Sequence, residues 1–314
     1  MSELLKVENL TKIFSKKGKE VRAVDDVSFS LNEKETIGLV GESGCGKSTT
    51  GRLVLNLIKP TSGTVSFMDK NIYTLNKKEL LDFRRNAQII FQDCFASLSP
   101  RFRVGDLIEE TLAIHHIGKN RKERMEMAAK VFEDVTLSPE LLNRYPHEFS
   151  GGQRQRIGIA RALCLNPKMI VCDEPVSALD VSIQAQIINM MQDIQQKYGL
   201  SYIFISHDLS VVKHISDRVI VMYLGKIVEY GDKKSFFENP RHPYTQALLS
   251  AIPVADISEK KEKIILKNEA NFEEYKPGCR FADRCWKACE ICRREQPQFT
   301  EVSPGHCVAC HRLD

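Results

Sequence analysis

The sequence contains no long hydrophobic run. Its most apolar stretches, residues 36–40, 169–172, 202–205 and 218–224, have the length of strands, whereas about 20 consecutive apolar residues are needed to cross a bilayer. The N-terminal residues also lack the cationic segment and apolar core of a secretory signal. We therefore expect a cytoplasmic location, and any association with a membrane is expected to be peripheral.

An excess of charge of one sign is absent as well. The 45 lysine and arginine residues only slightly outnumber the 41 acidic residues, so that the net charge is +4, and no long basic block occurs. This balance gives no indication of a nucleic-acid partner. With 314 residues, of which 42% are hydrophobic, the chain can bury one large core and carry one extension. We expect a large domain over residues 1–255, followed by a charged connector and a cysteine-bearing tail over residues 256–314.

Strand and helix patterns alternate along the large domain. The expected elements, in chain order, are strands at 5–14, 21–31, 36–40 and 63–68, a helical insertion at about 95–166, a strand at 169–173, a helix at 181–198 and a strand at 201–206. Such alternation predicts an α/β fold with a mostly parallel sheet, in which a ligand binds at the carboxyl ends of the strands.

A glycine-rich segment, GESGCGKST, joins the strand at 36–40 to a helix expected at 49–57. Glycines let backbone N–H groups close around a polyphosphate, and the helix N-terminus adds its dipole. Lys47 can neutralise the β- and γ-phosphate oxygens, and the Ser48 hydroxyl can bind Mg²⁺. The expected nucleotide-binding residues of this segment are Gly41, Ser43, Gly44, Cys45, Gly46, Lys47, Ser48 and Thr49.

Two adjacent carboxylates, Asp173 and Glu174, end the apolar strand at 169–173. In phosphoryl transfer, one carboxylate can hold the Mg²⁺ shell while its neighbour polarises the attacking water. Alone, this pattern would also describe a strand that ends in an acidic turn. Together with Lys47 and Ser48 it predicts ATP hydrolysis with Asp173 on Mg²⁺ and Glu174 as the base.

A second anion-binding corner is expected at residues 149–153, FSGGQ, which precede a basic amphipathic helix at 154–165. This motif resembles the LSGGQ signature of the ATP-binding cassette (ABC) ATPases, with Phe149 in place of leucine. By that resemblance the nucleotide of a partner subunit contacts Ser150, Gly151, Gly152 and Gln153.

Further positions match the same family. The resemblance implies that Gln92 is the glutamine that touches Mg²⁺, that His207 is the switch histidine on the γ-phosphate, and that Asp180 ends the loop after the carboxylates. It implies also that Phe14 stacks on adenine, although an apolar strand residue of this kind can simply pack in the core. The implied fold is an ABC ATPase core with a mixed sheet, an N-terminal antiparallel β subdomain and a helical subdomain. Two such domains sandwich two ATP molecules, and closure drives the membrane subunits.

Two segments resemble one branch of the family, the ATPases of oligopeptide, dipeptide and nickel importers. Residues 92–101, QDCFASLSPR, are similar to the QDPxASLNPR segment of that branch, and residues 241–253, RHPYTQALLSAIP, are similar to its HPYTxxLLxAIP segment. The resemblance implies a second, non-identical ATPase subunit, two membrane permeases and an extracellular solute-binding protein. It also implies a place at the cytoplasmic face of the membrane. The cargo, whether peptide, nickel or another small solute, stays open.

Six of the ten cysteines lie in the tail, at positions 279, 285, 289, 292, 307 and 310. The two CxxC pairs, Cys289/Cys292 and Cys307/Cys310, are compatible with a structural zinc site. The tail also resembles the C-terminal segment of the importer ATPases, and that likeness implies a 4Fe–4S cluster on Cys279, Cys285, Cys292 and Cys310. We favour the cluster over zinc. His306 or His311 could replace one ligand. The other four cysteines, Cys45, Cys94, Cys164 and Cys172, are expected to be packing residues.

Two other classes of function remain open. A soluble ABC ATPase that acts on nucleic acid or ribosomes usually has two cassettes or a long coiled coil, and this sequence has one phosphate loop and no sustained heptads. A metal-sensing regulator would use the tail as its active part and would hydrolyse little ATP. Co-purification with two permeases would separate these classes from the transporter subunit.

Overall fold

The computed structural model describes residues 2–16, 19–93, 98–252, 263–266 and 277–313. The expected role of Cys94, and most of the connector predicted at 256–276, lie outside the described residues. The chain divides into two compact units. Unit 1 comprises Met1–Leu5, Leu31–Glu35 and Ser66–Ile205, and unit 2 comprises Lys6–Ser30, Thr36–Val65 and Ser206–Asp314.

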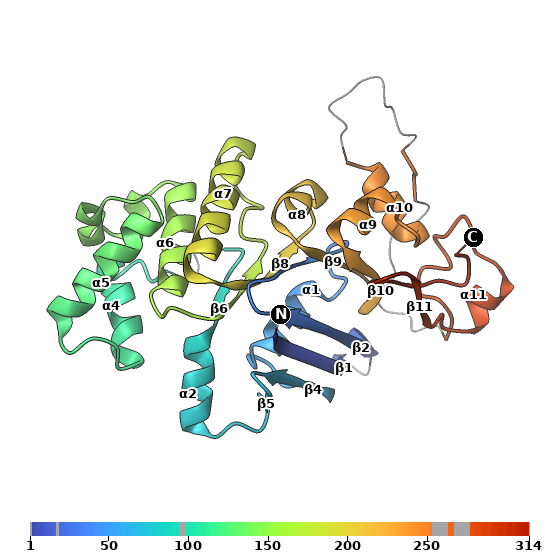
Figure 1. Ribbon diagram of the computed structural model, residues 1–314, viewed down its shortest axis with the longest axis horizontal. Coiled ribbons are helices and arrows are strands. Elements are labelled where there is room, and N and C mark those ends of the chain that lie inside the picture. The colour runs from blue at the N-terminus through green and yellow to red at the C-terminus, as the bar shows by residue number, and fades with distance from the viewer. Residues whose placement is uncertain (1, 17–18, 94–97, 253–262, 267–276, 314) are drawn as a thin grey trace. The chain divides into compact units, whose positions relative to one another are not determined.

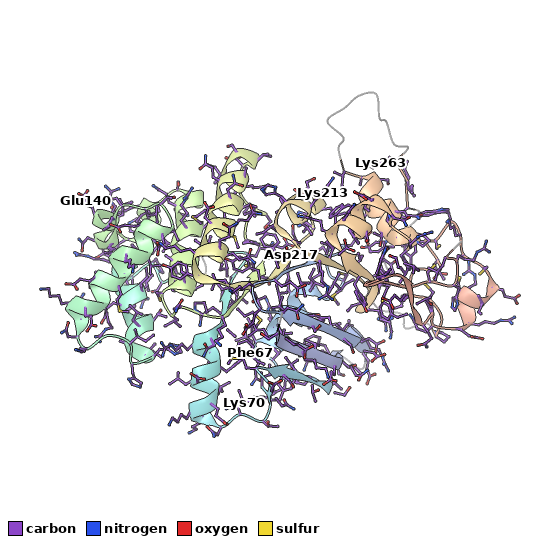
Figure 2. The ribbon with its side chains drawn as sticks, in the orientation of Figure 1. Phe67, Lys70, Glu140, Lys213, Asp217 and Lys263 are labelled. Carbon is purple, nitrogen blue, oxygen red and sulfur yellow. The ribbon has the colours of Figure 1, made fainter. Side chains whose placement is uncertain are left out.

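The N-terminal strands are longer than the sequence pattern predicted. β1 covers Glu3–Lys16 and β2 covers Lys19–Asn32, and β1 lies between β2 and β4 (Ser62–Phe67) in one sheet (Figure 1). The end of β4 turns into β5 (Lys70–Asn71) and pairs with it antiparallel, Phe67 opposite Lys70 (Figure 2).

Unit 1 contains three neighbouring parallel strands. β7 (Met169–Asp173) pairs with β6 (Ala87–Ile90) on one side and with β8 (Ser201–Ser206) on the other, with Met169 opposite both Ala87 and Ser201. Every residue of β7 and β8 is buried, as expected for parallel strands that are covered by helices. The helices α2 (Lys77–Asn86) and α6 (Gly151–Leu163) contact β6, and α6 also contacts α7 (Val181–Tyr198).

Between residues 98 and 166, part of the region where the sequence predicted a helical insertion, unit 1 contains several helices. α4 (Val104–Ile114) packs against α5 (Arg121–Asp134), and both contact α6 (Figure 1). Two short 3₁₀ helices, η1 (Pro139–Asn143) and η2 (Pro146–Glu148), lead into the signature segment. The apolar side chains Leu112, Ala128 and Phe132 are fully buried, so the helical spacing read from the sequence corresponds to a packed core.

Unit 2 contains a mixed sheet around the phosphate loop. β3 (Thr36–Val40) runs parallel to β9 (Arg218–Tyr223), and β9 is antiparallel to β10 (Lys226–Asp232). Asp217, labelled in Figure 2, immediately precedes β9. Its carboxylate accepts a hydrogen bond from the Thr36 N–H at 2.8 Å and so anchors the start of β3. α1 (Lys47–Val54) follows the loop, α8 (Leu209–Ile215) contacts β3, and α9 (Lys233–Glu238) contacts β9 and β10. Lys213 of α8 lies 5.6 Å from the ring centre of Phe237 (Figure 2).

The tail contributes strands to the same sheet. β12 (His306–Ala309) pairs antiparallel with β10, with Val308 opposite Glu229, and β11 (Phe299–Ser303) pairs with the other edge of β12. The order within unit 2 is thus β11-β12-β10-β9-β3. α10 (Pro243–Ser250) precedes the tail and α11 (Glu290–Arg294) lies within it. The sequence pattern predicted none of the tail strands, because they are short and show no clear alternation of apolar and polar residues.

Two helices begin earlier than predicted. α1 begins at Lys47 rather than Thr49, directly after the loop, and its end at Val54 is followed by Asn56 in a left-handed conformation, φ 52°. α6 begins at Gly151 rather than at 154, because Ser150 caps it. Gly46 is the N-cap residue of α1, and Gly151 and Gly152 lie in the first turn of α6. These glycines, which suggested loops in the sequence, therefore belong to the helix starts.

Candidate nucleotide site

The phosphate loop in unit 2 depends on glycines with positive φ. Gly41 has φ 148°, Gly44 81° and Gly46 108°, values that side chains rarely allow. A Cβ at Gly41 would lie 2.2 Å from the Met222 carbonyl oxygen, and a Cβ at Gly46 would lie 2.2 Å from the Ala23 carbonyl oxygen. The loop backbone therefore approaches its neighbours more closely than any other residue type would permit.

Lys47 is buried under this loop, with 4% of its surface exposed. Its Nζ donates to the carbonyl oxygens of Gly41 at 2.7 Å and Glu42 at 2.9 Å. Burial raises the pKa of the neighbouring Cys45 thiol, which therefore stays neutral beside the ammonium group. Within the described residues, no side-chain hydrogen bond caps α1 and no acidic residue lies in its first turn. A cationic helix N-terminus behind a glycine turn fits the phosphates of a nucleotide.

Unit 2 also contains Phe14 and His207. Phe14 is 43% exposed, with the Lys12 ammonium 5.1 Å from its ring centre. This exposure argues against the core-packing alternative. His207 is exposed and directly follows β8, where the next residue, Asp208, caps α8 by accepting from the Ser210 N–H at 2.8 Å.

Unit 1 contains the two carboxylates. Asp173 is buried at the end of β7, and Glu174 follows it with φ 49°, an unusual conformation for a residue other than glycine. The Glu174 N–H donates to the Ile205 carbonyl at 3.0 Å, and the Ser177 hydroxyl donates to the Glu174 carbonyl at 3.1 Å. Gln92, distant in sequence, donates from Nε2 to the Glu174 carboxylate at 3.1 Å. The structure thus brings together two predicted site residues, Gln92 and Glu174.

The signature segment, also in unit 1, is a helix cap. The Ser150 hydroxyl accepts from the Gln153 N–H at 3.3 Å, and the Gln153 side chain accepts from the Ser150 N–H at 3.0 Å. A Cβ at Gly152 would lie 2.8 Å from a methyl group of Ile183, so close packing against α7 requires glycine there. Gly151 and Asp180 are exposed, Asp180 as the N-cap residue of α7. The arrangement presents a helix N-terminus with small residues, as an anion site requires.

The tail cysteines form a small cluster of turns. The Cys279 N–H donates to the Cys292 carbonyl at 2.8 Å. Burial is the main cause that raises the pKa of Cys279 to about 12; the nearby Cys292, Cys310 and Cys285 add to it, and a backbone hydrogen bond from Phe281 opposes it. The sulfurs of Cys289 and Cys292 lie 3.4 Å apart. Even so, no set of three His, Cys, Asp or Glu side chains within the described residues is arranged to hold a metal ion.

The two tail histidines have partners other than the cysteines. His306 is buried, and its Nε2 lies 2.7 Å from the Glu229 carboxylate of β10. The ring of His311 lies 3.0 Å from the Glu295 carbonyl oxygen. Cys307, on β12, points to Tyr230, whose pKa is raised to about 12 by burial and by a hydrogen bond with this thiol. His306, His311 and Cys307 are thus each engaged with a partner other than a tail cysteine.

Comparisons with known proteins agree with this geometry. Residues 24–177 match the ABC transporter family, and residues 228–292 match the C-terminal region of oligopeptide/dipeptide transporters. A dimeric ATP-binding cassette solved in a post-hydrolysis state with ADP and phosphate superposes with a TM-score of 0.67 at 28% identity, over 73% of this chain and 98% of that one. A further cassette, CbiO1 from Clostridium perfringens, part of an ABC transporter complex, has the same TM-score at 25% identity, over 76% of this chain and 92% of that one.

The chain belongs to the ABC transporter family as one of its ATP-binding subunits, and it is an ATPase. Among its relatives, the oligopeptide transport ATP-binding protein AppF of Bacillus subtilis is 54% identical over 95% of this chain and 92% of that protein. The oligopeptide transport ATP-binding protein OppF of the same organism is 49% identical over 98% of this chain and 96% of that protein. Among the described residues, no helix has the length and apolarity needed to cross a membrane.

The sequence analysis did not predict the side-chain contacts that fix the phosphate loop in place, which involve Glu42, Tyr244 and Arg284. In the sequence, Glu42 looks like a spacer within the loop, and Tyr244 and Arg284 are only parts of the C-terminal segments. In the structure all three are in contact, because Arg284 and Tyr244 both hydrogen-bond to Glu42. The one available signal was Glu42 itself, a charged residue among the small residues of the loop.

Proposed function

We propose that this chain energises an importer of oligopeptides or dipeptides from the cytoplasmic face of the membrane. The observation that carries the proposal is the identity of about half of all residues, along nearly the whole chain, to two oligopeptide transport ATP-binding proteins. The match of residues 228–292 to the C-terminal region of such transporters supports it. The partners in this proposal are a second, non-identical ATPase subunit, two permeases and an extracellular solute-binding protein.

The roles proposed for individual residues follow from their chemistry. ATP supplies the phosphoanhydride bond, and Mg²⁺ offsets the charge of its phosphates. Lys47 and the amides of the loop bind the phosphates, while Ser48, Asp173 and Gln92 are the oxygen donors for the metal. Glu174 accepts a proton from the attacking water, and His207 contacts the γ-phosphate. Phe14 stacks on the base, and Ser150, Gly151, Gly152, Gln153 and Asp180 face the nucleotide of the partner subunit.

The proposed domain division accompanies these roles. Residues 1–255 form the nucleotide-binding domain, with an antiparallel N-terminal β subdomain and a helical subdomain at about 95–166, and residues 256–314 form the connector and the cysteine-bearing extension.

The test of this function is transport by the reconstituted complex. The chain would be co-purified with its two permeases and second ATPase, placed in vesicles, and supplied with its solute-binding protein and radiolabelled di- to pentapeptides. We expect ATP-dependent peptide uptake and ATP hydrolysis that is stimulated by the loaded binding protein. Uptake of Ni²⁺ without peptide uptake would instead assign the nickel branch, and failure to co-purify with any permease would overturn the transport role.

We propose also that Cys279, Cys285, Cys292 and Cys310 hold a 4Fe–4S cluster, with zinc as the alternative. The supporting observation is that Cys292 and Cys310 raise the pKa of both Cys279 and Cys285, and that Cys292 raises the pKa of Cys310, whereas Cys307 points to Tyr230. Thiolates suit both metals. The chain does not show the finished geometry of a metal site within its described residues, so binding requires the thiols to move closer together.

Anaerobic purification with metal analysis and visible absorption tests this second proposal. We expect about four iron and four sulfide per chain, with brown absorption that is lost in Cys292→Ser but kept in Cys307→Ser. A colourless protein with one zinc would support the alternative, and a protein without either metal would refute both.

A further inference from the structure

Glu42, in the middle of the phosphate loop, is held at all three of its polar groups. Its backbone N–H donates to the Tyr244 hydroxyl at 2.8 Å. Its carbonyl oxygen accepts from the Lys47 ammonium at 2.9 Å and from the Cys45 N–H at 3.2 Å. Its carboxylate accepts two hydrogen bonds from Arg284. A residue held at backbone and side chain together fixes the path of the loop around it.

The contact between Arg284 and Glu42 is a forked ion pair. Nη1 lies 2.7 Å from one carboxylate oxygen and Nη2 lies 3.0 Å from the other. The Arg284 side chain is only 10% exposed and that of Glu42 31%, so solvent screens the pair less than it would a surface pair. Burial lowers the pKa of Arg284, but its hydrogen bonds to Glu42 and Tyr223 outweigh this and raise it. Two parallel charge-assisted bonds impose direction as well as attraction.

An aromatic cluster holds both partners of Glu42 in place. The Tyr223 ring, at the end of β9, lies 4.6 Å from the ring centre of Tyr244 and 5.2 Å from that of Phe281. The guanidinium of Arg284 lies 5.8 Å from the Tyr223 ring centre. Tyr244 and Phe281 are almost completely buried. The cluster therefore packs residues of α10, β9 and the tail against one another, and this packing restricts the positions of Tyr244 and Arg284.

A second contact of the tail reaches the loop by another path. Arg280 donates to the Leu224 carbonyl and to the Asp25 carboxylate. The residue after Leu224, Gly225, donates its N–H to the Cys45 carbonyl at 2.8 Å. Both arginines thus brace the same loop, and Arg280 and Arg284 flank Phe281 in the short segment between Cys279 and Cys285.

We propose that Arg284 is a positioning residue for ATP binding, which holds the phosphate loop in its binding shape through Glu42. The tail is then part of the nucleotide site of its own subunit. Because the Lys47 ammonium donates a hydrogen bond to the Glu42 carbonyl oxygen, the position of Glu42 also sets the position of the Lys47 side chain. Preorganisation of this kind improves affinity because the loop does not have to be ordered on binding. The proposal rests on the ATPase identity of the chain and is independent of the transported cargo.

Nucleotide binding to the full chain tests the proposal. The affinity for MgADP would be measured by calorimetry, and hydrogen exchange of residues 41–49 would be followed in the same samples. For Arg284→Gln we expect affinity about tenfold weaker and faster exchange in the loop. Arg284→Lys, which keeps the charge but not the fork, should recover part of the loss. The matched control is Arg294→Gln, which removes another arginine of the tail, paired with Glu290 at the surface, and should match the wild-type chain.

Kinetics separate positioning from a general loss of stability. ATP hydrolysis by the same preparations should show a raised KM for Arg284→Gln with kcat within about twofold of wild type. Glu42→Gln should raise KM in the same way. The double variant should bind nucleotide no more weakly than either single variant, since both substitutions remove the same contact between Arg284 and Glu42. If Arg284→Gln does not fold, Glu42→Gln and Tyr244→Phe replace it, because both leave the tail intact. Wild-type affinity in these variants, or an equal loss in Arg294→Gln, would overturn the proposal.

Discussion

Glu174 combines an unusual backbone with a functional side chain. Its φ of 49° is a conformation that costs a residue with a Cβ about 1–2 kcal/mol. Contacts of its backbone to Ile205 and Ser177 hold it there. The same arrangement leaves the carboxylate 3.1 Å from the Gln92 amide. Strain at this one residue is consistent with a chemical role, and it could not be read from the sequence.

Replacement of Glu174 by glutamine should stop turnover without stopping binding. The amide has the same shape but cannot take a proton from water, so we expect hydrolysis to fall by at least about 100-fold. The measurement is phosphate release by Glu174→Gln against wild type, with the affinity for MgATP measured alongside. Retained turnover in this variant would show that another group is the base.

Gly46 is the residue at which the loop should be most sensitive to substitution. In Gly46→Ala the new methyl group would meet the Ala23 carbonyl at 2.2 Å, in addition to the strain of a φ of 108°. Gly305 is a matched control, because its φ is 73° and a Cβ added there would have no atom within 4 Å. We expect Gly46→Ala to lower the free energy of unfolding by about 1–3 kcal/mol more than Gly305→Ala, and only the former to abolish MgADP binding. Urea denaturation and calorimetry would check both, and equal losses in the two variants would contradict the role of the close approach.

At the scale of elements, buried and strongly periodic segments were predicted well. The bounds of β3, β7 and α7 agree with the sequence patterns because each has either an unbroken apolar run or a clear helical spacing. β10, β11 and β12 were not predicted, since pairing in the sheet decides their conformation and their own patterns are weak.

The N-terminus of α10 should make stability depend on pH. The His242 Nδ1 accepts from the Tyr244 N–H at 3.0 Å, and burial lowers the pKa of this histidine to about 4, against a smaller opposing effect of Glu229. The folded chain therefore binds the proton less readily than the unfolded chain, whose histidine titrates near 6.5. Stability is complete above pH 6.5 and falls as pH drops towards 4, by about 2 kcal/mol at pH 5.

The matched variant for this effect is His242→Asn, which can still cap the helix but does not titrate. Urea unfolding at pH 7.5, 6 and 5 should show a smaller loss of stability in the variant than in the wild-type chain, with the difference near 2 kcal/mol at pH 5. Parallel pH dependence in both proteins would mean that other groups carry it.

At the scale of the whole molecule, the predicted nucleotide residues fall into two sets. The phosphate loop, Phe14 and His207 belong to unit 2, while Gln92, the carboxylates and the signature segment belong to unit 1. The proposed ATP sandwich needs the loop of one subunit and the signature of another. Under the proposed function, one chain would supply parts of two composite sites.

We expect the two ATPase subunits to associate when ATP is bound, because each proposed composite site needs residues of both subunits. The Glu174→Gln chain mixed with its partner ATPase should elute as a dimer in MgATP and as monomers in MgADP. Adding Gly151→Asp, which puts a carboxylate at the signature corner, should weaken the dimer in MgATP because like charges repel the phosphates. Light scattering after size exclusion measures this. A dimer that forms equally without nucleotide would contradict the sandwich.

Residue types and short spacings were enough to predict the family, the phosphate loop and the pair of carboxylates, because such motifs need particular residues at fixed positions along the chain. The folded arrangement was needed to show that Gln92 contacts Glu174, that β12 pairs with β10 in the sheet of the phosphate loop, and that Arg284 and Tyr244 hydrogen-bond to Glu42. These contacts join residues far apart in the chain, and their distances depend on how strands and helices pack, which local spacing does not encode.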